Sequence, residues 1–273
     1  MLALARKELS ACSFRLFIVE KPNITPVMNE DLSTKRTEEE LKEAFVDGRG
    51  VKYSKDGRKL LKAPGELSGT YSVKEGTRII CNSAFWNCRS LSEIVIPSSV
   101  TSIGDFAFYG CDSLSEIVIP SSVTSIGDSA FSGCRSLSEI VIPSSVTTIV
   151  DRAFSDCRSL SEIVIPSSVT SIGDSAFSGC RSLTEIVIPS SVNSIGDWAF
   201  SDCRSLSEIV IPSSVTSIGE GAFYVCDSLS EVVIPSSVTS IGKGAFSNCK
   251  FPDNLKQELI SRFGDKIFSL WSI

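Results

Sequence analysis

Leu91–Cys111 reads LSEIVIPSSVTSIGDFAFYGC, and nearly the same pattern begins again at Leu114 and returns every 23 residues. Cysteines keep this step at positions 88, 111, 134, 157, 180, 203, 226 and 249, and prolines keep it from 97 to 235. A repeat of this length is typical of proteins in which each unit contacts only its neighbours. The repeat therefore predicts a stack of coils, one for each 23-residue unit.

The first part of each unit predicts a short strand. In Leu91–Ile96 the last apolar residues alternate with Glu93 and Val95, which is the spacing of a strand with one face turned inward. Pro97 cannot donate a hydrogen bond to a neighbouring strand, so the strand is expected to end there. Glu93 and Val95 are then expected to point outward from the stack.

The second part of each unit predicts about one turn of helix. Asp105–Cys111 has apolar residues three to four positions apart, and its acidic first residue suits a helix cap. Gly104 precedes this segment and recurs in most units, which would suit a positive φ angle. Val150 takes the same place in one unit, however, and a β-branched residue is strained at positive φ. We therefore predict a negative φ at Val150 and attribute the glycines to crowding.

A single unit has only one apolar edge, so successive units must stack Leu on Leu, Ile on Ile and Phe on Phe to close a core. We predict a solenoid of about eight right-handed coils, mainly β with short helical turns, with a parallel β-sheet on the concave face. The predicted divisions are an N-terminal segment (1–50) with a short helix near 38–46, a β-hairpin cap (51–68), the solenoid (69–250) and a C-terminal helical cap (251–273). Within the first of these, Phe14–Val19 has the composition of a strand.

One motif carries a resemblance to a known family. It is Leu-x-x-Ile-x-Ile-Pro-x-x-Val-x-x-Ile-Gly-x-x-Ala-Phe-x-x-Cys, within residues 71–250, and it resembles the BspA-like, or treponemal-type, leucine-rich repeats. Tyr53–Gly57, followed by Leu60–Pro64, also resembles a stretch that often precedes such repeats. The resemblance implies a leucine-rich-repeat solenoid. In many relatives it also implies a surface protein of bacteria or protists that adheres to proteins of a host or of neighbouring cells.

The composition disfavours catalysis and metal binding. The chain has no histidine, no Gly-x-Gly-x-x-Gly and no P-loop, and its carboxylates form repeated columns, whereas a catalytic pair needs two different environments. Parallel cysteine side chains about 4.8 Å apart have poor geometry for disulfides, so we expect free, buried thiols. Without histidine or Cys-x-x-Cys pairs, zinc is not expected. We predict no catalytic residue, no metal and no cofactor.

The outward residues of the strands are a candidate binding strip for a protein partner. Its central residues are Glu116, Val118, Glu139, Val141, Glu162, Val164, Glu185 and Val187. A line of carboxylates favours a basic partner. The competing interpretation is a solvated face, on which arginines four positions earlier pair with the glutamates. The candidate aromatic anchors are Trp86, Tyr109, Trp198 and Tyr224, with packing on the caps as the alternative.

These patterns predict a monomeric, non-enzymatic protein-interaction module, adhesin-like or scaffolding, that binds a protein partner through the repeated surface. The first alternative is a structural spacer with no ligand on the repeats. The second is an ordered-water or ice-binding surface formed by the Ser and Thr columns.

Charge and hydropathy exclude other partners. A net charge of −6 and a pI of about 4.9 argue against nucleic acid, and no stretch is long and apolar enough for membrane insertion. The first residues lack the apolar run of a secretory signal, which predicts a cytoplasmic location. The family resemblance implies the cell surface or secretion instead.

Overall fold

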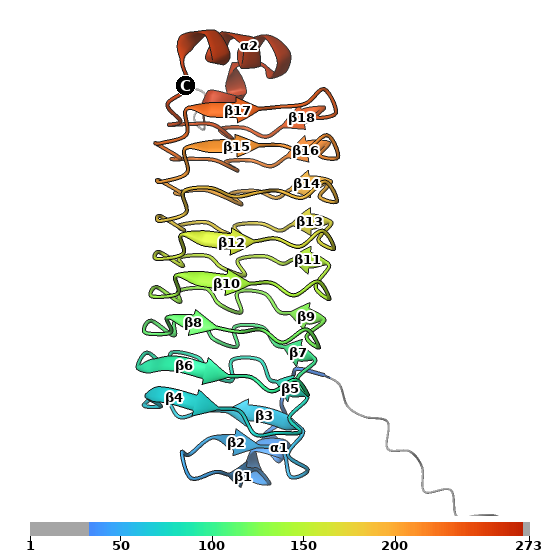
Figure 1. Ribbon diagram of the computed structural model, residues 1–273, viewed down its shortest axis with the longest axis vertical. Helices are drawn as coiled ribbons and strands as arrows, with labels where there is room; N and C mark the ends of the chain where they lie inside the picture. The colour runs from blue at the N-terminus through green and yellow to red at the C-terminus, as the bar shows by residue number, and fades with distance from the viewer. Residues whose placement is uncertain (1–32, 270–273) are drawn as a thin grey trace, which may run out of the picture. The chain divides into compact units, whose positions relative to one another are not determined.

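The computed structural model describes residues 33–269, most of which form coils stacked along one axis (Figure 1). The coils place their strands in two columns, followed by a series of turns. The first column contains β4 (Gly69–Ser72), β6 (Leu91–Val95), β8 (Glu116–Ile117), β10 (Glu139–Val141), β12 (Glu162–Val164), β15 (Glu208–Val210) and β17 (Glu231–Val233). The second contains β5 (Ile79–Ile80), β7 (Ser102–Ile103), β9 (Ser125–Ile126), β11 (Thr148–Ile149), β13 (Ser171–Ile172), β14 (Ser194–Ile195), β16 (Ser217–Ile218) and β18 (Ser240–Ile241). The predicted strand at Phe14–Val19 lies outside the described residues.

Equivalent residues of successive coils lie directly opposite each other. In the first column Ile140 pairs with Ile163, and in the second Ile172 pairs with Ile195, in both cases between parallel strands. Each pair is 23 residues apart in the sequence, so one repeat makes one coil. The predicted solenoid of 23-residue coils is confirmed.

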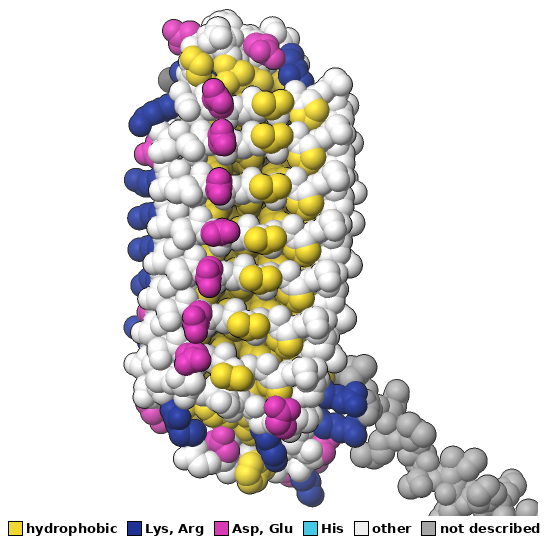
Figure 2. All heavy atoms as spheres, in the orientation of Figure 1, with side chains coloured by type: hydrophobic (Ala, Val, Ile, Leu, Met, Phe, Trp, Pro, Cys, Tyr) yellow, Lys and Arg dark blue, Asp and Glu magenta, His cyan; other side chains and the backbone are white. Residues whose placement is uncertain are grey.

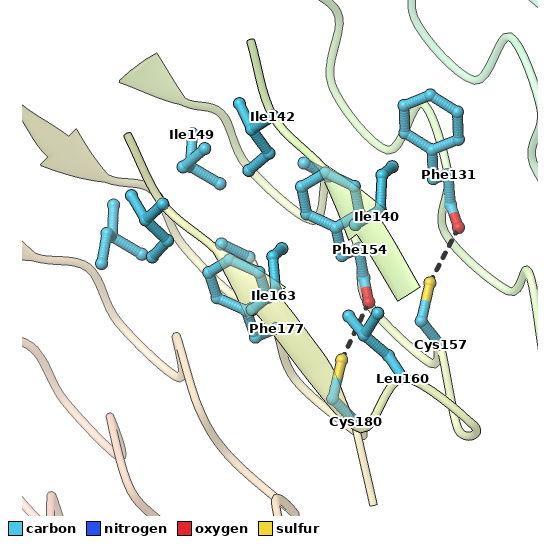
Figure 3. Close-up of a cluster of buried hydrophobic side chains, with 14 of the residues drawn as sticks. Phe131, Ile140, Ile142, Ile149, Phe154, Cys157, Leu160, Ile163, Phe177 and Cys180 are labelled. Carbon is cyan, nitrogen blue, oxygen red and sulfur yellow. Dashed lines mark hydrogen bonds between the residues drawn. The ribbon is translucent and has the colours of Figure 1, made fainter. Parts of the chain in front are cut away.

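The core consists of continuous columns of identical side chains between the two strand columns and the turns (Figure 3). The leucines, isoleucines and phenylalanines of these columns are all at most 8% exposed. From Phe85 to Phe246, successive rings have centroids 5.0–5.6 Å apart and planes within 11° of parallel. Burying one large apolar side chain contributes roughly 1.5–3 kcal/mol, so each coil is stabilised mainly by the neighbours that cover its own apolar edge.

The segments after the second strand column are tight turns and not the helical turns that the residue spacing predicts. The N–H of Tyr109 donates to the carbonyl of Phe106 at 3.1 Å, whereas the N–H of Phe108 donates to Ala130 of the next coil at 2.7 Å. A helix would direct both bonds along its own axis. Because every second N–H bonds to the next coil, the chain instead forms successive turns, with a positive φ of 55° at Phe106.

The acidic column at the start of these turns links coils. Oδ1 of Asp105 accepts a hydrogen bond from the backbone N–H of Asp128 at 3.1 Å, and Oδ1 of Asp174 accepts one from Asp197 at 2.8 Å. The expected cap within the same turn is therefore replaced by a bond to the following coil. These carboxylates accept hydrogen bonds from backbone N–H groups that would otherwise lack an acceptor between the coils.

Crowding explains the glycine column. Val150 does not have a positive φ, as predicted, and neither does Gly104 or Gly219. A Cβ atom on Gly219 would lie 2.5 Å from the backbone nitrogen of Asp197 and 2.5 Å from the carbonyl carbon of Gly196. The glycines therefore allow a close approach between coils and do not supply an unusual backbone angle.

We predict that Gly219→Val destabilises the protein by about 1–3 kcal/mol, because the new side chain must displace backbone of the preceding coil. Urea unfolding followed by circular dichroism measures the change. Ser207→Val is the matched control, because Ser207 is exposed on the same coil and a surface exchange usually changes stability by no more than about 0.5 kcal/mol. Equal losses in the two variants would contradict the crowding argument.

The N-terminal side of the stack begins with an antiparallel ribbon. β2 (Lys52–Tyr53) pairs antiparallel with β3 (Lys59–Lys62), and β3 also pairs in parallel with β5 of the first coil. The helix α1 (Glu38–Lys42) starts with a Thr37 and Glu40 capping box. It ends before the predicted residue 46 because β1 (Phe45–Val46) pairs with β2 instead.

The C-terminal side is covered by α2 (Asp253–Phe263) and by the 3-10 helix η1 (Asp265–Phe268). Gly264 separates the two with a φ of 81°. Backbone N–H groups of Gly244 and Phe246 donate to the carbonyls of Lys266 and Ile267. The segment after α2 therefore bonds to the last coil as a further coil would.

Candidate functional site

One face of the solenoid carries a line of glutamates beside a line of valines (Figure 2). We call this the Glu/Val face. It consists of the glutamates 93, 116, 139, 162, 185, 208 and 231 and the valines 95, 118, 141, 164, 187, 210 and 233. In each coil the two residues are two positions apart on an extended segment, so both side chains point outward. The residue between them, an isoleucine in six coils and Val232 in the last, points into the core.

The valines of this face are unusually accessible for apolar side chains in a regular array. Their exposure ranges from 48% at Val95 to 79% at Val187. Val141 lies opposite Val164 in the strand pairing, and Val210 lies opposite Val233. Near β6 and β8 the face is hollowed, with a volume of about 230 Å³ lined by Glu93–Ile96 and Glu116–Val118. The valines thus form a continuous exposed apolar line.

The glutamates of the Glu/Val face have no cationic partner in the part of the chain that the structure describes. Within residues 33–269 none of the seven makes an ion pair, although Glu93 accepts a hydrogen bond from the Thr70 hydroxyl. Two carboxylates about 5 Å apart repel by about 0.8 kcal/mol in water, a cost that salt reduces. The line therefore holds unbalanced negative charge.

The arginines expected to balance the glutamates pair with aspartates instead. Arg181 and Arg204 contact the two carboxylate oxygens of Asp202 at 2.7 and 2.6 Å, and Arg158 contacts Asp156 at 3.3 Å. Partial burial of Asp202 opposes its ionisation, but the hydrogen bonds from the two arginines hold its pKa below the ordinary value. The Arg–Glu pairing of the competing interpretation is not found within residues 33–269, because an aspartate at the adjacent turn is within reach of these arginines.

The cysteine column is structural. Sγ of Cys157 donates to the carbonyl of Phe131, and Sγ of Cys180 donates to that of Phe154, both at 3.2 Å (Figure 3). Burial raises the pKa of Cys157 to about 12, so the thiol stays protonated and unreactive. The eight column cysteines are free and buried, as predicted. Across residues 33–269, no group of three or more potential ligand side chains could hold a metal ion.

The aromatic candidates lie in the turn segments and form two separate clusters. Trp86 stacks on Tyr109 with ring centroids 4.4 Å apart, and Phe106 joins them at 5.6 Å from Trp86. Trp198 contacts Tyr224 edge-on at 5.5 Å. Phe106 occupies the repeat position that Trp198 occupies four units later. None of these residues belongs to the Glu/Val face.

The repeat and its geometry agree with a known family. A protein-family model described as the BspA type leucine rich repeat region matches residues 70–180 and 147–272, in six copies. The chain belongs to this family. In the BspA-type repeat of this chain, the leucine, isoleucine and phenylalanine columns supply the core, while the glutamate and valine positions remain on the surface.

Solved structures of bacterial leucine-rich repeat proteins are similar to this BspA-type chain. The leucine-rich repeat protein of T. pallidum is 33% identical, with a TM-score of 0.59, and the match covers 78% of this chain and 95% of that one. A leucine-rich repeat protein from Eubacterium ventriosum is 30% identical, with a TM-score of 0.64 and coverage of 71% and 51%. A leucine rich cell surface protein from Faecalibacterium prausnitzii is 31% identical, with a TM-score of 0.49 and coverage of 73% and 63%.

The chain thus spans 63% of the length of the F. prausnitzii protein and 51% of that of the E. ventriosum protein. No curated protein matches it. Between residues 33 and 269, neither α-helix combines the length and apolar character that crossing a bilayer requires.

Proposed function

We propose that this BspA-type solenoid is a non-enzymatic protein-interaction module that binds a protein partner through its Glu/Val face. The observation that carries the proposal is the unbroken line of seven exposed valines. A contiguous apolar strip with a polar rim is typical of a protein-binding surface. Here the rim is the line of glutamates, which favours a partner with basic residues.

Repetition is central to the proposed mechanism. Each coil offers the same Glu and Val pair, so a partner that contacts several coils binds each one weakly. Once the first contact has formed, the others are intramolecular, and affinity grows with the number of coils engaged. Near-identity between coils supports this mode of binding over catalysis, because an active site requires one place that differs from the rest.

Removal of whole coils tests this mechanism. The full chain is first used to capture protein partners. The affinity of each partner is then measured for the full chain and for variants that lack residues 137–159, 137–182 or 137–205. These deletions remove one, two and three units, so the register of the stack is kept. We expect the affinity to fall at every step. Affinity that stays unchanged in all three deletion variants would reject multivalent binding.

Charge reversal separates the proposal from a structural spacer. The reversed positions are Glu139, Glu162 and Glu185, which lie on the central coils. A spacer predicts that this change leaves binding intact, whereas binding through the Glu/Val face predicts a loss of at least 10-fold. The ordered-water alternative has less support, because Thr124, Thr170 and Thr239 direct their hydroxyls to carbonyls of the preceding coil at 3.3–3.4 Å.

A further inference from the structure

From the dimensions and charge of the Glu/Val face we infer that its partner segment is a cationic amphipathic α-helix lying along the solenoid axis. This inference rests on the proposed function and adds the conformation and chemistry of the partner. Two observations carry it. They are the line of carboxylates, which has no cationic partner among residues 33–269, and the repeat distance between coils.

The charge pattern requires cations on one side of an apolar stripe. The seven glutamates have no ion pair among the described residues, whereas the neighbouring arginines are already engaged by aspartates such as Asp156 and Asp202. The valines run parallel to the glutamates at a lateral distance of about 6.7 Å, which is two residues along a strand. A matching partner therefore presents Lys or Arg in one line and apolar side chains in the next.

The repeat distance decides which backbone can present such lines. Adjacent strands of a sheet lie about 4.8 Å apart, and the phenylalanine column on the turn side repeats at 5.0–5.6 Å. An α-helix has a pitch of about 5.4 Å and returns a side chain to the same face once per turn. One helical turn thus meets one coil.

An extended segment fits less well. Side chains on one face of a strand are about 6.7 Å apart, whereas the valines repeat about every 4.8 Å. After three coils, the side chains of an extended segment are therefore displaced by about 5.7 Å from the valines, which is more than the spacing of one coil. A helix is displaced by about 1.8 Å over the same distance. Long Lys and Arg side chains can absorb that smaller offset. The favoured contact therefore covers four or five coils, which corresponds to a helix of about 15–18 residues.

The surroundings leave this face open to a helix. The valines from Val118 to Val233 are all at least 56% exposed. α2 covers the last coil, where the Arg262 guanidinium donates to the carbonyls of Ile234 and Pro235. The central coils from Glu116 to Val187 carry no such cover in the described part of the chain, so the inferred helix lies over them.

Two synthetic peptides of identical composition test the inference. Both contain 18 residues of leucine, lysine and alanine. In the first, leucines recur at three- and four-residue spacing with lysines beside them, and in the second, leucines and lysines alternate. We expect the first peptide to bind the full chain at least 10-fold more tightly in fluorescence anisotropy, and to gain helical circular dichroism on binding. Raising NaCl from 50 to 500 mM should weaken this binding, because salt screens Lys–Glu attraction.

Variants of the chain locate the peptide. Replacement of Val141, Val164 and Val187 by threonine keeps their shape and should weaken binding of the first peptide at least 10-fold. The reverse exchange at Thr124, Thr147 and Thr170, which are exposed near the second strand column, is the matched control and should leave it unchanged. Equal binding of the two peptides, or indifference to the valine exchange, would overturn the inferred helix.

The outcomes also separate this inference from the proposed function. If captured protein partners require the valines but the alternating peptide binds as well as the helical one, the partner is not helical and the protein-binding role stands. If neither the captured partners nor the peptides respond to the valine exchange, both the helix and the role of the Glu/Val face are rejected.

Discussion

Raising the pH from 8 to about 10.5 is expected to unfold the solenoid. Burial raises the pKa of Cys88 to about 11 and the pKa values of Cys157 and Cys249 to about 12, and it raises the pKa values of the remaining column thiols as well. An unfolded cysteine has a pKa of about 8.5. The folded state therefore holds its thiol protons more tightly, and the resulting stability is complete below pH 8.5 and lost as pH rises toward 11–12.

The magnitude follows from the number of thiols. Each one lowers the free energy of unfolding by up to about 1.4 kcal/mol per pH unit above pH 8.5. Eight together lower it by about 11 kcal/mol per unit, which is comparable with the whole stability of a typical domain, about 5–15 kcal/mol. Urea unfolding at a series of pH values, with a reducing agent present, measures this slope.

A thiol-depleted variant is the control for alkaline unfolding. Replacement of Cys157, Cys180 and Cys203 by alanine should lower stability at pH 7 but reduce the slope above pH 8.5 by about 4 kcal/mol per unit. Deprotonation of surface lysines would act equally on both proteins. An unchanged slope in this variant would show that the buried thiols do not control the transition.

Phe154→Ala is expected to lower the free energy of unfolding by about 3–5 kcal/mol. Phe154 is fully buried in the middle of the stack, and its ring centroid lies 5.6 Å from those of Phe131 and Phe177. Alanine leaves a cavity on which both neighbouring coils lose contacts. Because each coil is held by its neighbours, hydrogen exchange should show the largest loss of protection between residues 131 and 180.

The matched control is Phe106→Ala. Phe106 lies in the turn two units before that of Phe154 but is 37% exposed and outside the ring stack. We expect this change to cost less than about 1 kcal/mol. Urea unfolding measures the free energy of unfolding of both variants. Similar losses of this free energy would show that the stacked rings do not stabilise the protein more than an exposed phenylalanine does.

The outward position of the candidate binding residues could be predicted from the sequence. Glu139 and Val141 flank Ile140 on a strand, and the period of two places them on the opposite side from the core. That Glu139 forms no ion pair with any residue the structure describes could not be predicted in this way. An arginine four positions earlier was within plausible reach, and only the turn geometry shows that arginines such as Arg181 contact an aspartate of the next coil.

The sequence by itself determined the stacking of the coils and the composition of every column, because identical apolar edges can be buried only against copies of themselves. The tertiary structure decided how the turns are bonded. Asp105 accepts a hydrogen bond from Asp128 of the next coil, and the N–H of Phe108 donates one to Ala130 of the next coil. The residue pattern of a single unit does not show how close the atoms of the next coil lie. The stacking of equal apolar side chains was thus readable from residue spacing, whereas the hydrogen bonds and ion pairs between coils required the positions of both coils.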